Sequence, residues 1–270
     1  MFSVVDNIDS FEMLVKVLFD DSKGSIRKDP DRIRSPYAFR GMHDIKYDLV
    51  PSLRRNCKDE IWLETNLMRN FARYAASVEP KVTSSVWYNM TIGQHHGLPT
   101  RLLDWTYSPL VAMHFATDDP DYLKIDESDA VIWKTHIGEI NGLLPPIYQK
   151  KLKEQYAYVL TTDLMASITN DLEQYDRDMV DRSIAFMEPP SIDARIVNQY
   201  ALFSIVPSEI ANMEEFFRHN GSKTSKIIID KSLKKTIRDM LDQMNMTERL
   251  LYPGLDGLAT WLKRHYCVKA

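Results

Sequence analysis

The densest group of reactive side chains lies between Gly93 and Thr106, in the string Gly-Gln-His-His-Gly-Leu-Pro-Thr-Arg-Leu-Leu-Asp-Trp-Thr. Polar groups beside an apolar run need hydrogen-bonding partners. So many different polar groups in one segment kinked by Gly and Pro favour a pocket over a purely structural loop. The simpler alternative is that Arg101 and Asp104 pair to hold the loop.

Two further segments carry groups that could contact a ligand. In Phe39-Arg40-Gly41, the guanidinium is the natural fork for phosphate or carboxylate. Gly41 would let a ligand approach the backbone closely; the alternative is a surface arginine in a turn. Asn198 and Gln199 stand at the start of an apolar strand, where Gln199 could contact a ligand or satisfy the backbone at the strand end.

The composition excludes several classes of site. Only 9 of 270 residues are Gly, and neither GxGxxG nor GxxxxGK[ST] occurs, which argues against a phosphate-binding glycine loop. The net charge of −4 argues against a general nucleic-acid coat, although a few arginines would suffice for a local basic groove. The 44% of hydrophobic residues and the 27% of charged residues are typical of a globular protein.

Metal and membrane chemistry are not expected. Cys57 and Cys267 have no CxxC partner, which excludes a cysteine-rich zinc site and suggests a reducing compartment. His95 and His96 are adjacent, so their side chains would diverge on a helix, and no HxxxH or carboxylate spacing supports a metal site. No signal peptide and no run of about 18 apolar residues is recognised. We expect a cytoplasmic protein with no membrane partner.

The elements that must position these groups alternate between helices and strands. We expect strands at residues 36–41, 100–106, 130–134, 197–206 and 227–230. Residues 51–55 read as a turn. Helices are expected near residues 9–18, 60–76, 84–96, 231–245 and 255–266, with another that begins at Ser108-Pro109 and one or two within 142–181. No repeat or linker is apparent. This pattern predicts an α+β fold: one mixed domain over residues 1–270, with small central β-sheets flanked by helices.

Several of these segments together resemble the FRG domain family, which is named after its Phe-Arg-Gly motif. The resemblance rests on Phe39-Arg40-Gly41, on the string from Gln94 to Thr106, and on Leu49–Arg55 and Pro109–Ala116. It continues with Arg195, Gln199 and Phe203 and with Leu251–Gly257, so it spans about Pro36 to Leu262. Ala201 and Gly254 stand where the family has Gly and Asp. We expect a motif core at about residues 34–120 and a strand–helix part at about 185–265.

A second resemblance, to the ADP-ribosyltransferase scaffold, implies a role for NAD. In that scaffold a first-strand Arg grips NAD, a strand with hydroxyls lines the nicotinamide pocket, and a later strand supplies Glu. Arg40 matches the first position, and Thr106 with Ser108 the second. The third position offers Gln199 in place of Glu, with Glu188 and Glu209 as the nearest substitutes.

These resemblances imply an enzyme that uses NAD as a substrate to modify a protein or a nucleic acid, in a bacterial or phage defence or toxin-like setting. An antitoxin or regulatory protein would be its partner. Arg40, His95, Asp104 and Gln199 would be catalytic. Either Trp105 or Tyr107 would stack on the nicotinamide. The residues expected to bind NAD are Arg40, Gly41, Thr100, Arg101, Trp105, Thr106 and Ser108.

Two other functions stay open at this point. The first is a non-catalytic module that binds a nucleotide or a nucleic acid through Arg40, Arg54, Arg55 and Arg101. The second is a nuclease built on His95, His96 and Asp104, which lacks a second carboxylate at metal-binding spacing.

Overall fold

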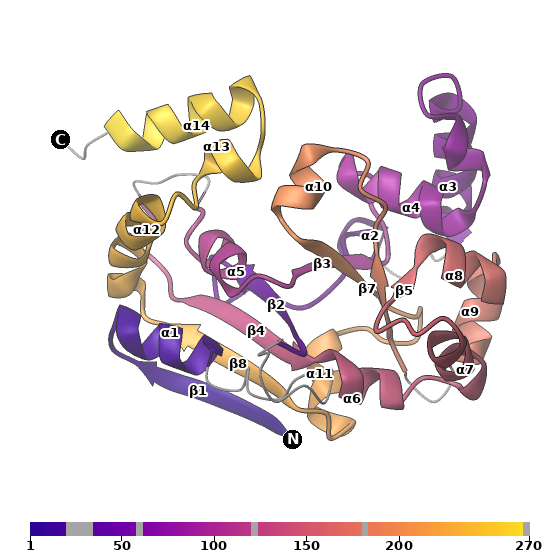
Figure 1. Ribbon diagram of the computed structural model, residues 1–270, viewed down its shortest axis with the longest axis horizontal. Coiled ribbons are helices and arrows are strands. Elements are labelled where there is room, and N and C mark those ends of the chain that lie inside the picture. Colours follow the sequence, from indigo (N-terminus) through magenta and orange to yellow (C-terminus); the bar gives the residue numbers. More distant parts are fainter. Residues whose placement is uncertain (20–34, 58–61, 120–123, 180–182, 267–270) are drawn as a thin grey trace.

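The computed structural model describes residues 1–19, 35–57, 62–119, 124–179 and 183–266. Its centre is an eight-stranded sheet in the order β1-β8-β4-β2-β3-β7-β6-β5, with helices packed around it (Figure 1). The mixed class and the flanking helices are as expected from the sequence. The expected small sheets are instead joined into one. Cys267 lies outside the described residues.

The strands pair in both directions. Only β1 with β8 and β5 with β6 are parallel, and the other neighbours are antiparallel. The strand bounds are β1 Phe2–Ile8, β2 Tyr37–Met42, β3 Leu102–Thr106, β4 Ala130–His136, β5 Leu160–Thr161, β6 Ala185–Glu188, β7 Ala201–Ile205 and β8 Thr224–Ile229.

The sheet consists of two halves that barely touch through the backbone. β2 pairs with β4 along its whole length, and β3 pairs likewise with β7. Between β2 and β3, however, the register of the described strands has the one pair Phe39–Thr106. The half-sheet β1-β8-β4-β2 and the half-sheet β3-β7-β6-β5 therefore part at Arg40 on one side and at Asp104 on the other.

Helices cover the sheet and connect its strands. Ser85 accepts a hydrogen bond from the backbone N–H of Tyr88 and so caps α4. Ser108 caps α5 in the same way, with Pro109 in the first turn as the sequence predicts. The helices are α1 Phe11–Phe19, α2 Ser52–Cys57, α3 Trp62–Ala75, α4 Val86–His95, α5 Pro109–Ala116, α6 Ile137–Gly142, α7 Pro146–Glu154, α8 Thr162–Ile168, α9 Leu172–Asp178, α10 Ala194–Asn198, α11 Met213–His219, α12 Lys234–Gln243, α13 Glu248–Leu251 and α14 Leu255–Tyr266, with 3₁₀ turns η2 Pro80–Thr83 and η4 Lys231–Leu233.

Two of the expected elements are wrong. The turn expected at residues 51–55 is largely the helix α2. The strand expected from Val197 begins only at Ala201, because Asp193 caps the short helix α10 before it. Gln199 is the C-cap of that helix, and Tyr200 has a left-handed backbone with φ of 48°. The strands β1, β5 and β6 and the helices α6, α11 and α13 were not expected. The described part of residues 142–181 contains three helices, α7, α8 and α9, where one or two were expected.

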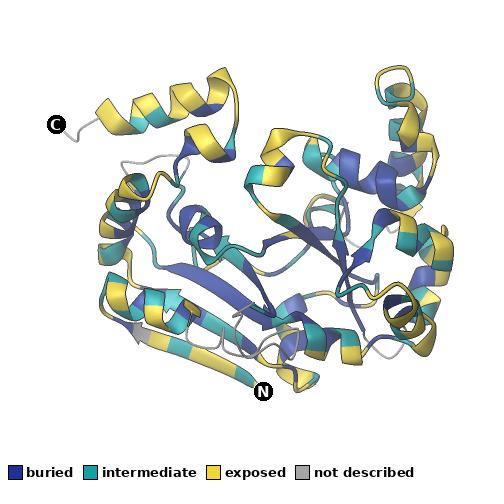
Figure 2. Cartoon of the chain, viewed as in Figure 1, coloured by how far each residue is buried: buried dark blue, intermediate teal, exposed yellow. Residues whose placement is uncertain are grey.

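The core runs through both halves of the sheet. Its first cluster joins Trp133 of β4 to Trp105 of β3 across the line where the halves part. Figure 2 shows the central strands buried and the outer faces of α3 and α14 exposed. None of the helices in the described ranges combines the length and the hydropathy that a membrane span requires.

Candidate functional site

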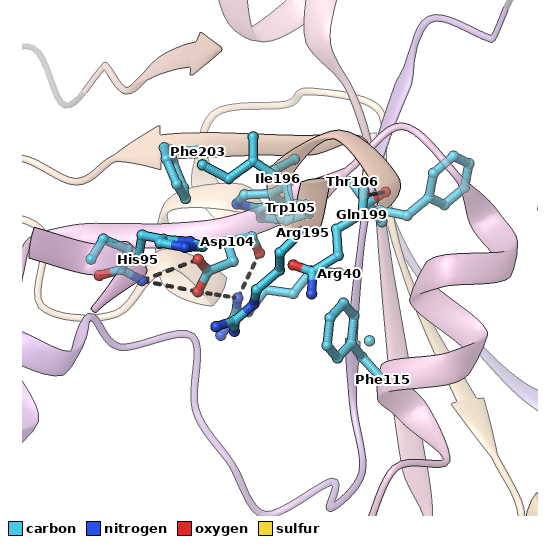
Figure 3. A pocket seen from close by; sticks show the side chains of 14 residues that line it. Arg40, His95, Asp104, Trp105, Thr106, Phe115, Arg195, Ile196, Gln199 and Phe203 are labelled. Atoms are coloured by element: carbon cyan, nitrogen blue, oxygen red, sulfur yellow. Dashed lines mark hydrogen bonds and ion pairs between the residues drawn. The ribbon is translucent and has the colours of Figure 1, made fainter. Parts of the chain in front are cut away.

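A pocket of about 280 Å³ opens where the two half-sheets part. It is lined by residues of β2, β3, β7, α4, α5 and α10. The four residues expected to be catalytic, Arg40, His95, Asp104 and Gln199, all line it (Figure 3). Its volume lies near the lower limit for small-molecule pockets, so it can enclose a nucleoside-sized part of a ligand.

Arg40 crosses the gap between the half-sheets. Its Nη1 donates to the backbone oxygen of Asp104 at 2.5 Å and lies 3.7 Å from the Asp104 carboxylate, while its Nε is buried without a partner. The pKa of Arg40 is lowered because burial removes water from the guanidinium; Asp104 opposes this effect and Arg55 adds to it. Arg40 is therefore a cation whose charge is only partly compensated.

The Asp104 carboxylate is held by a chain of side-chain hydrogen bonds. The Nε2 of Gln94 donates to both Asp104 oxygens, at 3.2 and 3.0 Å. The hydroxyl of Thr100 donates to the Oε1 of Gln94 at 2.6 Å and accepts from the backbone N–H of Leu102. This chain fixes the Gln94 amide so that its NH₂ faces Asp104. Thr100 thus acts through Gln94 and does not line the pocket.

His95 lies at the end of α4, opposite the cap of α10. Its Nε2 is 2.6 Å from the Oδ2 of Asp193. The pKa of His95 is lowered, first because the ring is partly buried; Asp193 opposes this shift, and Arg195 and His96 add to it. The ring is therefore neutral near pH 7. Because Nε2–H can donate to Asp193, Nδ1 is left as the basic nitrogen.

The amides of α10 serve the structure. The Nε2 of Gln199 donates to the backbone oxygen of Leu251 at 3.0 Å, and the Nδ2 of Asn198 donates to that of Leu250 at 2.7 Å. The backbone oxygen of Gln199 also accepts from the hydroxyl of Thr106 at 2.7 Å. Gln199 lines the pocket, but the NH₂ of its amide holds α10 against α13. The second of the two roles considered for it, satisfying backbone groups, is the one observed.

Three residues expected to contact NAD make structural contacts, although two of them, Gly41 and Trp105, also line the pocket. A Cβ on Gly41 would lie 1.9 Å from the backbone oxygen of Ala112, so this glycine is required by the packing of α5 on β2. Ser108 is the cap of α5 and does not line the pocket. Trp105 contributes to the pocket wall but is only 3% exposed: its Nε1 donates to Ser204 and its ring packs edge-on against two core phenylalanines, Phe186 and Phe217.

Arg101 does not reach the pocket. It is buried and forms ion pairs with Glu64 and Asp176. The simpler alternative of an Arg101–Asp104 pair is not observed either, because Asp104 contacts Gln94 and Arg40.

The carboxylates considered as substitutes for the missing Glu lie elsewhere. Glu188 accepts a hydrogen bond from the hydroxyl of Tyr107 at 2.6 Å, and neither residue lines the pocket. Glu209 lines a different cavity, next to α11. Asp104, with a side chain 60% exposed, is therefore the carboxylate that lines the pocket among the described residues.

Two pocket residues, and one residue that contacts the pocket, were not singled out for chemistry by the sequence. Arg195 projects from α10, Phe115 from α5, and Asp193 holds His95. The signal that could have found Asp193 is its residue type, since Asp is favoured at the position directly before a helix. Within the described ranges no group of three or more His, Cys, Asp or Glu side chains is arranged to hold a metal ion.

Residues 35–124 match the model of the FRG domain family. The matched stretch runs from β2 past α5 and includes Arg40, Gln94, His95 and Asp104. Neither the comparison with curated proteins nor that with solved structures returned a match. The later motif residues Arg195, Gln199 and Phe203 lie outside the matched stretch, yet they line the same pocket. The chain therefore contains an FRG domain, matched over residues 35–124.

Proposed function

We propose that the chain transfers the ADP-ribosyl group of NAD to a protein or nucleic-acid acceptor. The observation that carries this proposal is the meeting of Arg40, Asp104 and His95 in one pocket at the parting of the sheet. Each brings a group that glycosidic-bond cleavage needs: a cation for the phosphates, a carboxylate for the ribose and a base for the acceptor.

The charges of the pocket suit this substrate. Its lining carries two guanidiniums, Arg40 and Arg195, against one carboxylate, Asp104, and His95 is neutral. This local excess of positive charge occurs in a chain whose net charge is −4. An anionic ligand would compensate Arg40 where burial has removed its water.

In the proposed reaction the bond between the nicotinamide nitrogen and C1′ of the ribose breaks, and its electron pair leaves with the nicotinamide. The Asp104 carboxylate stabilises the positive charge that develops at C1′. Nδ1 of His95 takes the proton from the acceptor nucleophile that forms the new bond to C1′, and Asp193 stabilises the resulting imidazolium. Asp104 thereby takes the place of the expected Glu, for which Gln199 offers no carboxylate.

The biological setting is part of the same proposal and is supported by the resemblance alone. The enzyme would work in the cytoplasm as a toxin-like effector in bacterial or phage defence, restrained by an antitoxin or regulatory protein.

The test is to incubate the purified chain with NAD labelled in its ADP-ribose part and with cell lysate. We expect nicotinamide release and transfer of the label. Asp104→Asn keeps the shape and one of the two Gln94 contacts while it removes the charge, so release should fall by about 100-fold or more. Asp163→Asn, at an exposed carboxylate of α8, is the matched control. If a folded wild-type sample releases no nicotinamide, the transferase proposal is wrong.

A second candidate function is a non-catalytic nucleotide-binding module. It is favoured by Gln199, which offers no carboxylate at the expected Glu position and whose Nε2 is bonded to the backbone oxygen of Leu251. Calorimetry with NAD separates the two candidates, because binding without nicotinamide release supports the module. If short RNA binds, the slope of affinity against salt counts its phosphate contacts.

A further inference from the structure

The second guanidinium of the pocket comes from a different element. Arg195 lies on α10, whereas Arg40 lies on β2, and both line the same cavity (Figure 3). Arg195 is exposed and forms no ion pair within the part of the chain that the structure describes. Its guanidinium carbon stands 5.1 Å from the centre of the Tyr252 ring. The positive charge of Arg195 is thus available to a ligand.

We infer that Arg40 and Arg195 form a subsite for a diphosphate group, so that the pocket selects ligands with two linked phosphates over monophosphates and nucleosides. This inference deepens the proposed function, on which its choice of ligand rests. A guanidinium presents a planar fork that binds the oxygens of one phosphate. Two forks in one pocket correspond in number to the two phosphates of a diphosphate ester, each of which carries one negative charge.

Both forks are held in place before any ligand binds. The Nη1 of Arg40 is anchored to the backbone oxygen of Asp104. Its Nε is buried and has no protein partner. The arm of Arg195 rests on the face of Tyr252, a cation–π contact. Side chains that are already ordered lose little conformational entropy on binding.

The position of Arg195 depends on the attachment of α10 to α13. Asp193 caps α10 by accepting from the backbone N–H of Ile196 at 2.9 Å. Asn198 and Gln199 then fasten its other end to the carbonyl groups of Leu250 and Leu251. The chain segment that supplies Tyr252 is therefore the one to which α10 is tied, so the two partners of the cation–π contact move together.

The experiment is a calorimetric titration with ADP-ribose, AMP and adenosine. We expect the wild-type chain to bind ADP-ribose at least about 10-fold more tightly than AMP, because AMP fills one fork. Arg195→Gln should weaken ADP-ribose binding by about 10- to 100-fold and AMP binding by much less. Arg195→Lys, which keeps the charge without the fork, should lie between the two. Arg177→Gln, at an exposed arginine of α9, is the matched control.

Two outcomes overturn the subsite: equal affinity of the wild type for ADP-ribose and AMP, or unchanged ADP-ribose binding in Arg195→Gln. Because Arg195 is exposed, its variants should fold, and circular dichroism checks this. Nicotinamide release is a separate readout. Diphosphate-selective binding without release keeps the subsite and removes the transferase. Release by Arg195→Gln with an unchanged KM for NAD removes the subsite and keeps the transferase.

Discussion

At the scale of single residues, Arg101 shows that a side chain expected to bind a ligand can have a structural role instead. Its Nε donates to both carboxylate oxygens of Glu64, at 2.8 and 3.0 Å, and its Nη1 to Asp176 at 2.6 Å. Burial by itself would lower the pKa of Arg101, but the hydrogen bonds and charges of Glu64 and Asp176 outweigh it and raise that pKa. One guanidinium thus ties the residue just before β3 to α3 and α9.

We predict that Arg101→Met strongly destabilises the fold. The substitution fills a similar volume but leaves the buried Glu64 and the partly buried Asp176 without their cation, which should cost about 3–5 kcal/mol of unfolding free energy. Arg69→Met, at an exposed arginine of α3, is the control and should change stability little. Urea unfolding at pH 7 measures both. A loss below about 1 kcal/mol for Arg101→Met would contradict this account.

The sequence predicted most of the residues of the site, but it did not predict which side chains of β3 face the pocket and which face the core. It predicted Arg40, His95, Asp104 and Gln199 as one site, and all four line the pocket. Trp105 directly follows Asp104 on β3, and successive side chains of a strand point to opposite faces. Asp104 is therefore exposed in the pocket while Trp105 packs in the core. Which face is buried depends on the packing of the whole sheet, which no local pattern contains.

At the scale of elements, the sequence predicted the long periodic helices well and the short or unusual elements poorly. The helix expected at residues 255–266 is observed with those bounds. A helix of five residues, such as α10, is too short to show a period, so its apolar residues read as part of β7. The edge strand β1 pairs with β8, more than 200 residues away, and such pairing leaves no local signal.

A buried charged network joins α5 to the last helices of the described chain. The Nη1 of Arg238 on α12 donates to the Nδ1 of His114 on α5 at 3.0 Å, and its Nη2 donates to Glu248 on α13 at 2.7 Å. Arg264 on α14 also donates to Glu248. Although burial opposes ionisation, these two arginines bring the pKa of Glu248 down to about 2. The network fixes α13, and α13 in turn holds α10 at the pocket.

This network predicts a loss of stability in mild acid. The pKa of His114 is lowered, first by burial and also by Arg238, although Asp118 and Glu248 oppose the shift. Below about pH 6.5 the His114 ring is therefore protonated in the unfolded chain while it stays neutral in the folded chain. Stability is full above that pH and falls as pH drops towards the lowered pKa, by at most about 1.4 kcal/mol per pH unit for this one group.

The measurement is urea unfolding at a series of pH values from 7.5 downwards. His114→Gln keeps an acceptor for Arg238 but cannot be protonated, so its stability should depend less on pH in this range. His96→Gln, at an exposed histidine, is the control. Parallel curves for the wild type and His114→Gln would show that this ring does not carry the effect.

At the scale of the whole molecule, side-chain packing joins what the backbone leaves apart. The half-sheets share the single described pair Phe39–Thr106. Phe217 of α11 lies between them: its ring centre is 6.1 Å from that of Trp105 on β3 and 6.2 Å from that of Trp133 on β4. The pocket can therefore open between the half-sheets on one side while a continuous core closes them on the other.

We predict that the described sheet unfolds as one cooperative unit and that Phe217 is central to its cohesion. Phe217→Ala removes a fully buried ring in contact with both halves and should cost about 3–5 kcal/mol. Far-ultraviolet circular dichroism and tryptophan fluorescence should give coincident urea transitions in the wild type, because indoles of both halves share one core. Phe19→Ala, at a half-exposed ring of α1, should cost far less. Two separate transitions in the wild type would mean that the half-sheets are independent, and the pocket between them would then need a ligand to hold its shape.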